Sequence, residues 1–291
     1  MIQAVCICGA GTMGSGIAQV CAQSGFATIL FDIDKTILEK AKLSIQQSLH
    51  YLTDKQKISA EEKEQIFQRL QFSNNINDCK ADLIIEAIVE KVESKTTLFD
   101  QLSGINNSET IFATNTSSLS ISEIQKNILH PERVVGMHFF NPAPVMKLVE
   151  VVKGELTSEE VAQATYKLCD QMNKTPVLCK DAPGFIVNRI ARHYYLEALK
   201  LVEKGFTSFE NVDAVMEATG FKMGPFKLMD LIGMDINLSV SQSIYEAFNK
   251  AERFKPSSVQ IEKIKSGELG RKTGRGFYPY PLKGNKGNTL A

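Results

Sequence analysis

The glycine-rich segment Gly9–Gly14 limits the fold of this chain more than any other part of its sequence. It follows a short apolar run at residues 3–8, and the apolar residues after it recur at helical spacing, at Ile17, Ala18, Cys21 and Ala22. The order is strand, glycine loop and helix, which is the unit from which parallel α/β sheets are built. A second apolar run at 27–31 ends at Asp32, roughly twenty residues after the glycines.

The three glycines of this G-x-G-x-x-G motif have different physical tasks. Gly9 permits a tight turn, Gly11 lets the backbone approach a pyrophosphate, and Gly14 lets the helix pack against the strand. The amides at the start of the helix, at Thr12 and Met13, would face the anion. The acid that ends the second apolar run would accept hydrogen bonds from ribose hydroxyls and repel a 2′-phosphate. The motif therefore predicts a dinucleotide site that prefers NAD to NADP.

Strand and helix patterns continue to alternate beyond this motif. Amphipathic segments marked by Leu38–Leu52 and Ile66–Leu70 predict an antiparallel helical excursion after the second strand. Ser120, with Glu123 three residues later, predicts a capping box at a helix start. Short apolar runs and the helical spacing between them predict strands at 82–88, 110–114, 133–140 and 148–152, and helices at 92–102 and 120–128.

The pattern changes at Asp181-Ala182-Pro183, where Asp suits a helix cap and Pro suits the first turn. Helical spacing dominates after this point, at 187–201, 210–218 and 237–250. We therefore predict an α/β fold with a Rossmann-type, doubly wound, mainly parallel sheet over residues 1–182. A smaller all-α domain is predicted over residues 183–291.

Composition limits the partners of this chain. Its 33 Lys plus Arg residues balance 33 Asp plus Glu, so no net field attracts nucleic acid or an anionic membrane. No apolar run approaches the roughly 18 residues of a membrane helix. The first residues lack the basic region of a secretory signal. These observations predict a cytoplasmic protein without a nucleic-acid or membrane partner.

The six cysteines have neither C-x-x-C nor zinc-site spacing, which predicts reduced thiols and no bound metal. Cys6 and Cys8 would point to the same face of a strand, an arrangement that could suggest a metal site. We favour small buried hydrophobic side chains at both positions.

His138 is the most informative histidine, because it ends an apolar strand where Asn141-Pro142 breaks the pattern. Ligands of open α/β sheets bind at the carboxyl ends of strands, although a single histidine on an apolar strand is more often a packed core residue. Glu150 changes that balance, since it shares a strand face with apolar residues and a buried carboxylate needs a partner. A carboxylate on one ring nitrogen fixes the tautomer and stabilises the imidazolium, as a general base requires.

Two further polar residues fit the same edge less specifically. Ser117 belongs to the polar loop after the strand at 110–114, which places its hydroxyl at the carboxyl edge of the sheet. Asn188 lies one residue off the apolar stripe of the helix after Pro183, where it could face a crevice between the domains. Judged alone, Ser117 belongs to an ordinary polar loop, and a solvated amide is the favoured interpretation of Asn188.

At these residues the sequence resembles the short-chain L-3-hydroxyacyl-CoA dehydrogenases, and the bacterial 3-hydroxybutyryl-CoA dehydrogenases in particular. The resemblance covers nearly the whole chain in a fixed order of blocks. These blocks are residues 9–14, 86–90, 115–119, 138–142, 146–150, 183–189, 223–226 and 272–278.

The resemblance implies that His138 is the base, that Glu150 orients it, and that Ser117 and Asn188 position the C3 oxygen of the substrate. It implies further residues near NAD, namely Glu90, Lys95, Ser117, Asn141 and Lys272. It also implies coenzyme A contacts at Ser48, Lys55 and Ser117. A lysine suits the anionic phosphates of CoA, although a solvated surface charge explains Lys55 as well.

Two departures from the family pattern stand out. Lys227 follows the Met-Gly-Pro-Phe block where the family usually has Glu, which leaves open any charge pair at that point. Cys6 and Cys8 replace the common aliphatic residues of the first strand.

The resulting hypothesis is an NAD-dependent enzyme that interconverts (S)-3-hydroxyacyl-CoA, with 3-hydroxybutyryl-CoA as the expected substrate, and 3-oxoacyl-CoA in fatty-acid or butanoate metabolism. Two alternatives remain open. One is a dehydrogenase of free hydroxy acids on the same scaffold, and the other is a dinucleotide-binding protein without catalysis. The apolar residues of the helical half, such as Phe206, Phe221 and Leu231, predict a homodimer face, although they could also form a core.

Overall fold

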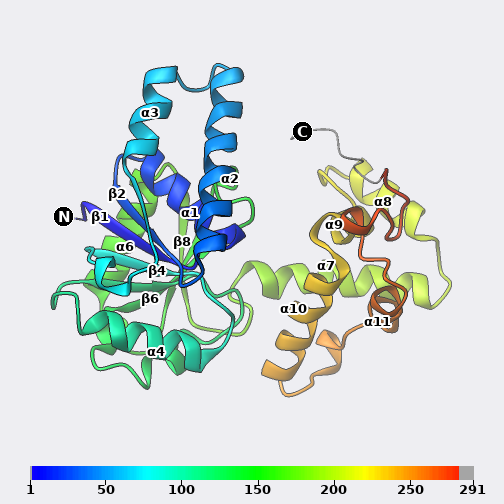
Figure 1. Cartoon of the computed structure of the whole chain (residues 1–291). Coiled ribbons are helices and arrows are strands. Elements are labelled where there is room, and N and C mark those ends of the chain that lie inside the picture. The colour runs from blue at the N-terminus through cyan, green and yellow to red at the C-terminus, as the bar shows by residue number, and fades with distance from the viewer. Residues whose placement is uncertain (1, 282–291) are drawn as a thin grey trace. The chain divides into compact units, whose positions relative to one another are not determined.

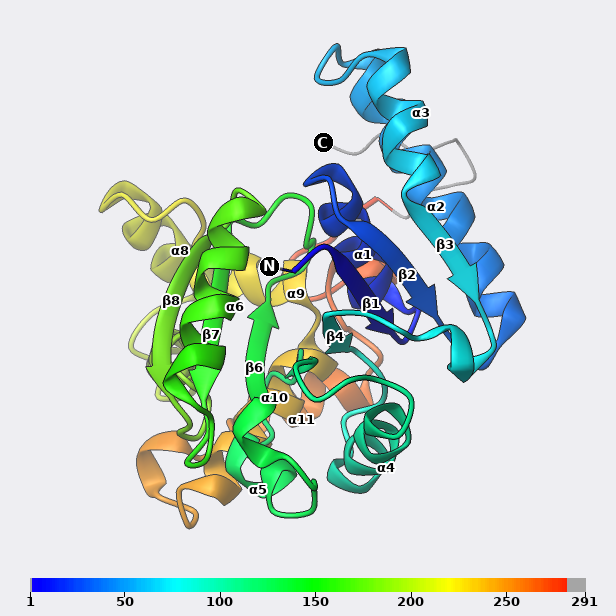
Figure 2. The ribbon, with the colours of Figure 1, turned by 90° about the vertical axis from the view of Figure 1, so that its left-hand side faces the viewer.

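The computed structural model describes residues 2–281, and the chain divides into two compact units, Met1–Phe185 and Ile186–Ala291. The first unit is built on one eight-stranded sheet in the order β3-β2-β1-β4-β5-β6-β7-β8 (Figures 1 and 2). Its strands are β1 (Ala4–Cys8), β2 (Ala27–Phe31), β3 (Leu70–Ser73), β4 (Leu83–Glu86), β5 (Ile111–Thr114), β6 (Val134–Phe139), β7 (Leu148–Lys153) and β8 (Thr175–Lys180).

The sheet is doubly wound about its central strands. All neighbouring strands are parallel except β6 and β7, which are antiparallel. The strand order reverses between β1 and β4, which is the position at whose carboxyl edge open α/β sheets bind their ligands. The helices that pack on this sheet are α1 (Thr12–Gln23), α4 (Val92–Ser103), α5 (Ile121–Gln125) and α6 (Glu159–Gln171). The predicted α/β class and mainly parallel sheet are confirmed.

Both faces of the sheet are buried, which explains the continuous apolar runs of its central strands. On β1, Ile7 packs in an apolar cluster with Ile17 of α1. The alternate residue Cys6 packs in the second cluster with Phe99 of α4. The side chains of β1 therefore meet an apolar layer on both faces of the sheet.

In the first unit, two edge strands and one helix were not predicted from the sequence, and in the second unit α9 (Pro225–Ile232) and α11 (Ser258–Lys265) were missed as well. The helix predicted to include Leu70 ends at Gln68, and Leu70 begins β3. At the opposite edge, α6 and β8 were missed. Edge strands bury only part of their surface, and β8 has a single buried residue, Pro176, among exposed and half-buried ones, so neither strand shows a buried apolar run.

The predicted helix start at Asp181-Ala182-Pro183 is wrong, because α7 (Val187–Glu203) begins later, after Ile186. The Asp181 carboxylate instead accepts hydrogen bonds from Ser120 Oγ (2.6 Å) and Ser122 N (2.8 Å) at the start of α5. Ser120 caps α5 as predicted, but Glu123 pairs with Lys126 at 2.5 Å, and no return bond closes the capping box.

The helical excursion after β2 is a hairpin of α2 (Lys35–Asp54) and α3 (Ala60–Gln68), which projects beyond the sheet in Figures 1 and 2. The α2 face that packs against the domain carries Leu38, Ala41, Ile45 and Leu49. A capping box of Ser59 and Glu62 starts α3.

The second unit is helical in its described residues, and residues 282–291 of the predicted second domain lie outside them. Its α-helices are α7, α8 (Phe209–Ala218), α9 (Pro225–Ile232), α10 (Met234–Ala247) and α11 (Ser258–Lys265). Lys227, the departure from the family pattern, pairs within this unit with both carboxylate oxygens of Glu217, at 2.9 and 2.8 Å. Among the helices of residues 2–281, none combines the length and apolar character needed to cross a bilayer.

Candidate active site

The turn after β1 leaves room for a phosphate group. Gly9 has φ +102°, and a Cβ there would lie 2.6 Å from the carbonyl oxygen of Ala87. A Cβ at Gly14 would overlap the carbonyl oxygen of Gly9. At Gly11 a Cβ would meet nothing within 4 Å. Gly9 and Gly14 therefore serve internal packing, whereas Gly11 faces open space, as the approach of a pyrophosphate requires.

The start of α1 fits the same anion. Thr12 and Met13 are its first residues, no side chain caps the amides there, and its first turn contains no acidic residue. Asp32, directly after β2, accepts hydrogen bonds from Ala10 N (2.8 Å, on Oδ2) and from Asp34 N (3.0 Å, on Oδ1). These bonds hold the carboxylate at the turn, and each of its oxygens keeps a lone pair for a ribose hydroxyl.

His138 and Glu150 are direct neighbours across the antiparallel pair β6–β7. The distance from His138 Nδ1 to Glu150 Oε2 is 2.7 Å, and their side chains are 7% and 1% exposed. The imidazole ring also packs against Phe140 and Phe185, with ring centroids 4.4 and 5.8 Å away. Because Nδ1 is engaged by the carboxylate, the ring orientation is fixed and Nε2 is the nitrogen for proton exchange.

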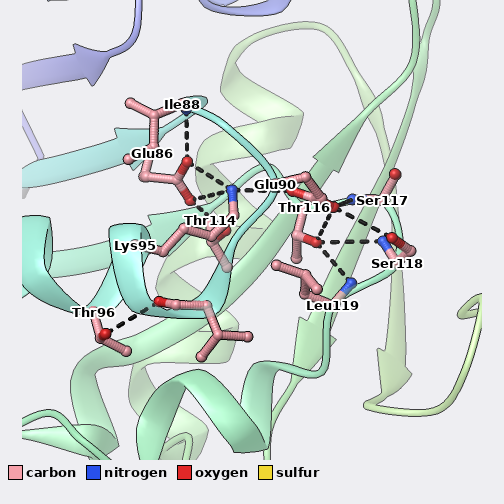
Figure 3. A network of polar contacts seen from close by, with 11 residues as sticks. Glu86, Ile88, Glu90, Lys95, Thr96, Thr114, Thr116, Ser117, Ser118 and Leu119 are labelled. Carbon is pink, nitrogen blue, oxygen red and sulfur yellow. Dashed lines mark hydrogen bonds and ion pairs between the residues drawn. The ribbon is translucent and has the colours of Figure 1, made fainter. Parts of the chain in front are cut away.

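The polar loop after β5 contains Ser117 and is organised by Glu90. Glu90 Oε1 accepts hydrogen bonds from Thr116 Oγ1 (2.5 Å) and Ser117 N (3.0 Å), as Figure 3 shows. Asn115 Oδ1 accepts a hydrogen bond from the amide of Phe139, the residue after His138, at 2.8 Å. This loop, residues 115–119 and called the serine loop below, is therefore hydrogen-bonded both to the loop after β4 and to β6, the strand that carries His138.

Lys95, predicted to lie near the cofactor, is buried and pairs with two carboxylates. Its Nζ lies 2.7 Å from Glu86 Oε1 and 3.1 Å from Glu90 Oε2. Burial raises the pKa of the Glu86 carboxyl, against the pull of the Lys95 ammonium. Burial also opposes ionisation of Glu90, but Lys95 and the Thr116 hydroxyl outweigh it and lower the pKa of that carboxyl.

Sequence reasoning gave Glu86 no function of its own, because it closes an apolar strand. The signal that could have found it is a fully buried strand ending in an acid, followed nine residues later by a lysine on the buried face of a helix. An unpaired acid in that position would be costly, so the pairing could have been expected.

The loop after β6 carries Asn141 and is held by a second buried lysine. Lys174 Nζ donates hydrogen bonds to the carbonyl oxygens of Ala143 (2.5 Å) and Met146 (2.9 Å). Burial lowers the pKa of Lys174. This residue was missed because it lies between α6 and β8, the elements that the sequence did not reveal.

The other predicted residues lie elsewhere in the chain. Asn188 is the second residue of α7, and Lys272 pairs with both carboxylate oxygens of Asp235, at 2.5 and 2.6 Å, in the second unit. Ser48 lies in the second half of α2, and Lys55 is its C-cap. Neither takes part in the hydrogen bonds described above.

Three thiols come together beside the first strand. Cys6, Cys8 and Cys79 have their Sγ atoms within 4.8 Å of one another. Hydrogen bonding to Cys79 and burial raise the pKa of Cys6 well above its usual value, and hydrogen bonding to Cys6 and burial do the same for Cys8. The two thiols are therefore protonated at neutral pH and pack as small apolar side chains, as predicted for buried cysteines.

Comparison with family models accounts for both parts of the chain. Residues 4–182 match the model described as 3-hydroxyacyl-CoA dehydrogenase, NAD binding domain. Residues 184–280 match 3-hydroxyacyl-CoA dehydrogenase, C-terminal domain. The chain belongs to the 3-hydroxyacyl-CoA dehydrogenase family. The predicted family and the predicted cofactor, NAD, are thereby confirmed.

Individual members of this family match most of the chain. The 3-hydroxyadipyl-CoA dehydrogenase of Escherichia coli (strain K12) is 45% identical over 281 residues, which are 96% of this chain and 59% of the relative. The crystal structure of 3-hydroxybutyryl-CoA dehydrogenase from Escherichia coli K12 is 43% identical with a TM-score of 0.94, over 100% of this chain and 61% of that one. This chain therefore spans about three fifths of the length of these two relatives.

A relative of matching length is the (S)-3-hydroxybutyryl-CoA dehydrogenase of Ralstonia eutropha. Its crystal structure is 38% identical to this chain with a TM-score of 0.92. The match covers 97% of this chain and 100% of that one. The similarity therefore extends over both parts of this chain and over the whole of that solved chain.

Proposed function

We propose that this chain is an NAD-dependent dehydrogenase that interconverts (S)-3-hydroxyacyl-CoA and 3-oxoacyl-CoA. The proposed substrate is 3-hydroxybutyryl-CoA, because two solved relatives are named for it. The observation that carries the proposal is the buried 2.7 Å contact between His138 Nδ1 and Glu150 Oε2. A protein that only bound a dinucleotide would gain little from burying such a pair.

In the oxidation direction, His138 Nε2 accepts the proton of the C3 hydroxyl. Glu150 holds the ring through Nδ1 and stabilises the imidazolium that forms, without itself taking up a proton. Bound NAD⁺ supplies the redox chemistry by taking up the hydride from C3. In the reverse direction the His138 imidazolium returns its proton to the oxygen at C3.

Ser117 and Asn188 are the groups that we propose to position the C3 oxygen. The backbone of Ser117 is fixed by its 3.0 Å hydrogen bond to Glu90, so its hydroxyl is presented from a defined position. The lowered pKa keeps Glu90 ionised at neutral pH, and the charged acceptor strengthens this bond. We propose Glu90, Lys95, Asn141 and Lys272 as residues of the NAD site, with the glycine turn and Asp32.

The same proposal includes the coenzyme A contacts, the roles of the two domains, the oligomeric state and the metabolic setting. Ser48 and Lys55 on α2 would contact the coenzyme A moiety, since an exposed lysine suits its phosphates. Residues 1–182 would bind NAD, and residues 183–291 would serve as the substrate and dimerisation domain. Exposed apolar side chains of the second unit support the dimer, among them Phe206 (74% exposed), Val215 (60%) and Phe221 (51%). We place the reaction in fatty-acid or butanoate metabolism, in the cytoplasm.

The test of the reaction is the loss of NADH absorbance on addition of acetoacetyl-CoA and of longer 3-oxoacyl-CoA substrates. We expect turnover with the four-carbon substrate. Turnover of free hydroxy acids without turnover of any acyl-CoA would instead support a dehydrogenase of free acids. NADH binding without turnover of any of these compounds would support a binding protein. Sedimentation tests the dimer, and a monomer at micromolar concentration would contradict it.

A further inference from the structure

The buried carboxylate of Glu86 stands between the two loops that form the proposed site. Glu86 ends β4, and its backbone is in register with Cys8 of β1 on one side and Thr114 of β5 on the other. The strand β1 leads directly into the glycine turn, and β5 leads into the serine loop. A side chain at this position can influence the geometry of the carboxyl edge without touching a ligand.

The hydrogen bonds of Glu86 are fully satisfied. Oε1 accepts hydrogen bonds from Lys95 Nζ (2.7 Å) and Ile88 N (2.7 Å). Oε2 accepts from Lys95 Nζ (2.8 Å) and Thr114 Oγ1 (2.6 Å). The Glu86 side chain is 0% exposed and that of Lys95 is 1% exposed, so neither group can exchange its partner for water. Lys95 Nζ is therefore held in one place by a fixed carboxylate.

The Lys95 ammonium is also linked to the serine loop, through Glu90. Lys95 Nζ lies 3.1 Å from Glu90 Oε2, and the second oxygen of Glu90 binds the amide of Ser117. In Figure 3 the Lys95 nitrogen lies between the two carboxylates, and the serine loop lies beyond Glu90. Two carboxylates thus share one cation, and the position of that cation sets the position of Glu90.

We propose that Glu86 is a positioning residue of the dehydrogenase: it fixes Lys95 so that Glu90 holds Ser117 in place. The contacts run from Glu86 to Lys95, from Lys95 to Glu90, and from Glu90 to the backbone of Ser117. This inference rests on the proposed function for its effect on turnover, but not for its effect on the serine loop.

The test variant is Glu86→Gln, which keeps the size of the side chain and removes its charge. Asp82→Asn is the matched control, because Asp82 stands beside the other end of β4 and accepts hydrogen bonds from Gln3 N (2.7 Å) and Ala4 N (3.0 Å). Both substitutions remove a carboxylate that binds backbone amides, but only Glu86 is linked to Glu90.

Steady-state kinetics separate positioning from general stabilisation. We expect Glu86→Gln to lower kcat about tenfold to a hundredfold, as small misplacements at an active site do. The NADH dissociation constant, measured by fluorescence, should change less than kcat, since the glycine turn and Asp32 are untouched although Lys95 and Glu90 belong to the proposed NAD site. Asp82→Asn should lower the thermal unfolding midpoint and leave kcat unchanged. Equal kcat in Glu86→Gln and wild type would overturn the proposal.

A double-substitution cycle tests the route through Glu90. If Glu86 acts through that residue, Glu86→Gln should have little further effect on kcat in a Glu90→Gln background. The same fold-change in both backgrounds would show that Glu86 acts independently of Glu90 and would overturn the proposed route.

Amide hydrogen exchange provides a readout that does not depend on turnover. We expect the amides of residues 116–119 to exchange faster in Glu86→Gln than in wild type or Asp82→Asn. If Glu86→Gln does not fold, Thr114→Val takes its place, because it removes one donor to Glu86 and should show the same local change. Unchanged exchange in this loop would overturn the proposal. If the wild-type protein turns over no acyl-CoA, the proposed function fails while the exchange result still decides this inference.

Discussion

Glu150 lies directly opposite His138 in the register of β6 and β7, and 2.7 Å separates its Oε2 from the histidine Nδ1. The pair is held by the hydrogen bonding of two antiparallel strands, which fixes both Cα positions. A substitution of either side chain therefore tests its chemistry while the strands remain paired.

Glu150→Gln should lower kcat by about 10²- to 10⁴-fold, because the amide oxygen can still accept a hydrogen bond from Nδ1 but cannot stabilise an imidazolium by charge. The KM for NADH should stay close to the wild-type value, since Glu150 makes no predicted contact with the dinucleotide. Steady-state kinetics with acetoacetyl-CoA provide the measurement. A variant with more than a third of the wild-type kcat would argue against any role of the carboxylate in proton transfer.

Gly11→Ala and Gly14→Ala should affect different properties, NADH binding and thermal stability respectively, although both add one methyl group to the same motif. The Gly11 methyl group would meet no protein atom within 4 Å, so the protein should fold normally but bind NADH at least about tenfold more weakly. The Gly14 methyl group would overlap the carbonyl oxygen of Gly9, so this variant should lose thermal stability, as overpacked sites do by about 1–3 kcal/mol. Thermal unfolding and NADH fluorescence distinguish the two. Normal NADH affinity in Gly11→Ala would contradict the placement of the pyrophosphate.

Asp32→Ala should reduce the preference for NADH over NADPH. The substitution removes a charged acceptor for ribose hydroxyls, and bonds of this kind contribute about 1.5–3 kcal/mol, or roughly 10- to 100-fold in kcat/KM for NADH. It also removes the repulsion of a 2′-phosphate, so kcat/KM for NADPH should not fall to the same extent. The comparison of kcat/KM for the two cofactors checks this, and an unchanged ratio would show that Asp32 does not select between them.

Lys55→Glu should raise the KM for acetoacetyl-CoA by roughly tenfold and leave kcat and the KM for NADH unchanged, because it reverses a charge at the proposed CoA contact on α2. Lys167→Glu on α6 is the control, since it makes the same charge change at another exposed helix position. Equal KM values for acetoacetyl-CoA in the two variants would show that Lys55 does not contact the substrate.

The central sheet could be predicted from the sequence because its strands are buried on both faces. Runs such as residues 3–8 and 133–140 are mostly apolar, and they contain β1 and β6. The edges could not be predicted in this way. The short strand β3 and the largely unburied strand β8 each leave part of their surface exposed, so their composition is similar to that of a loop.

The candidate site also contains residues that the sequence could predict and residues that it could not. His138 and Glu150 were predicted to touch because a buried carboxylate in one strand needs a partner in another, and the sheet register places them opposite each other. The partners of the buried Lys174 could not be predicted, because they depend on three-dimensional contacts. Lys174 binds carbonyl oxygens about thirty residues away in sequence. The Asp181 prediction failed because a local capping preference was overridden by a long-range contact with Ser120.

The measurement that tests the account most directly is kcat of His138→Asn for the reduction of acetoacetyl-CoA, with the NADH dissociation constant determined on the same preparation. The account predicts that kcat falls by about 10²- to 10⁴-fold while NADH binding stays close to wild type. A variant that keeps kcat within about threefold of wild type would contradict the assignment of His138 as the proton-transferring group.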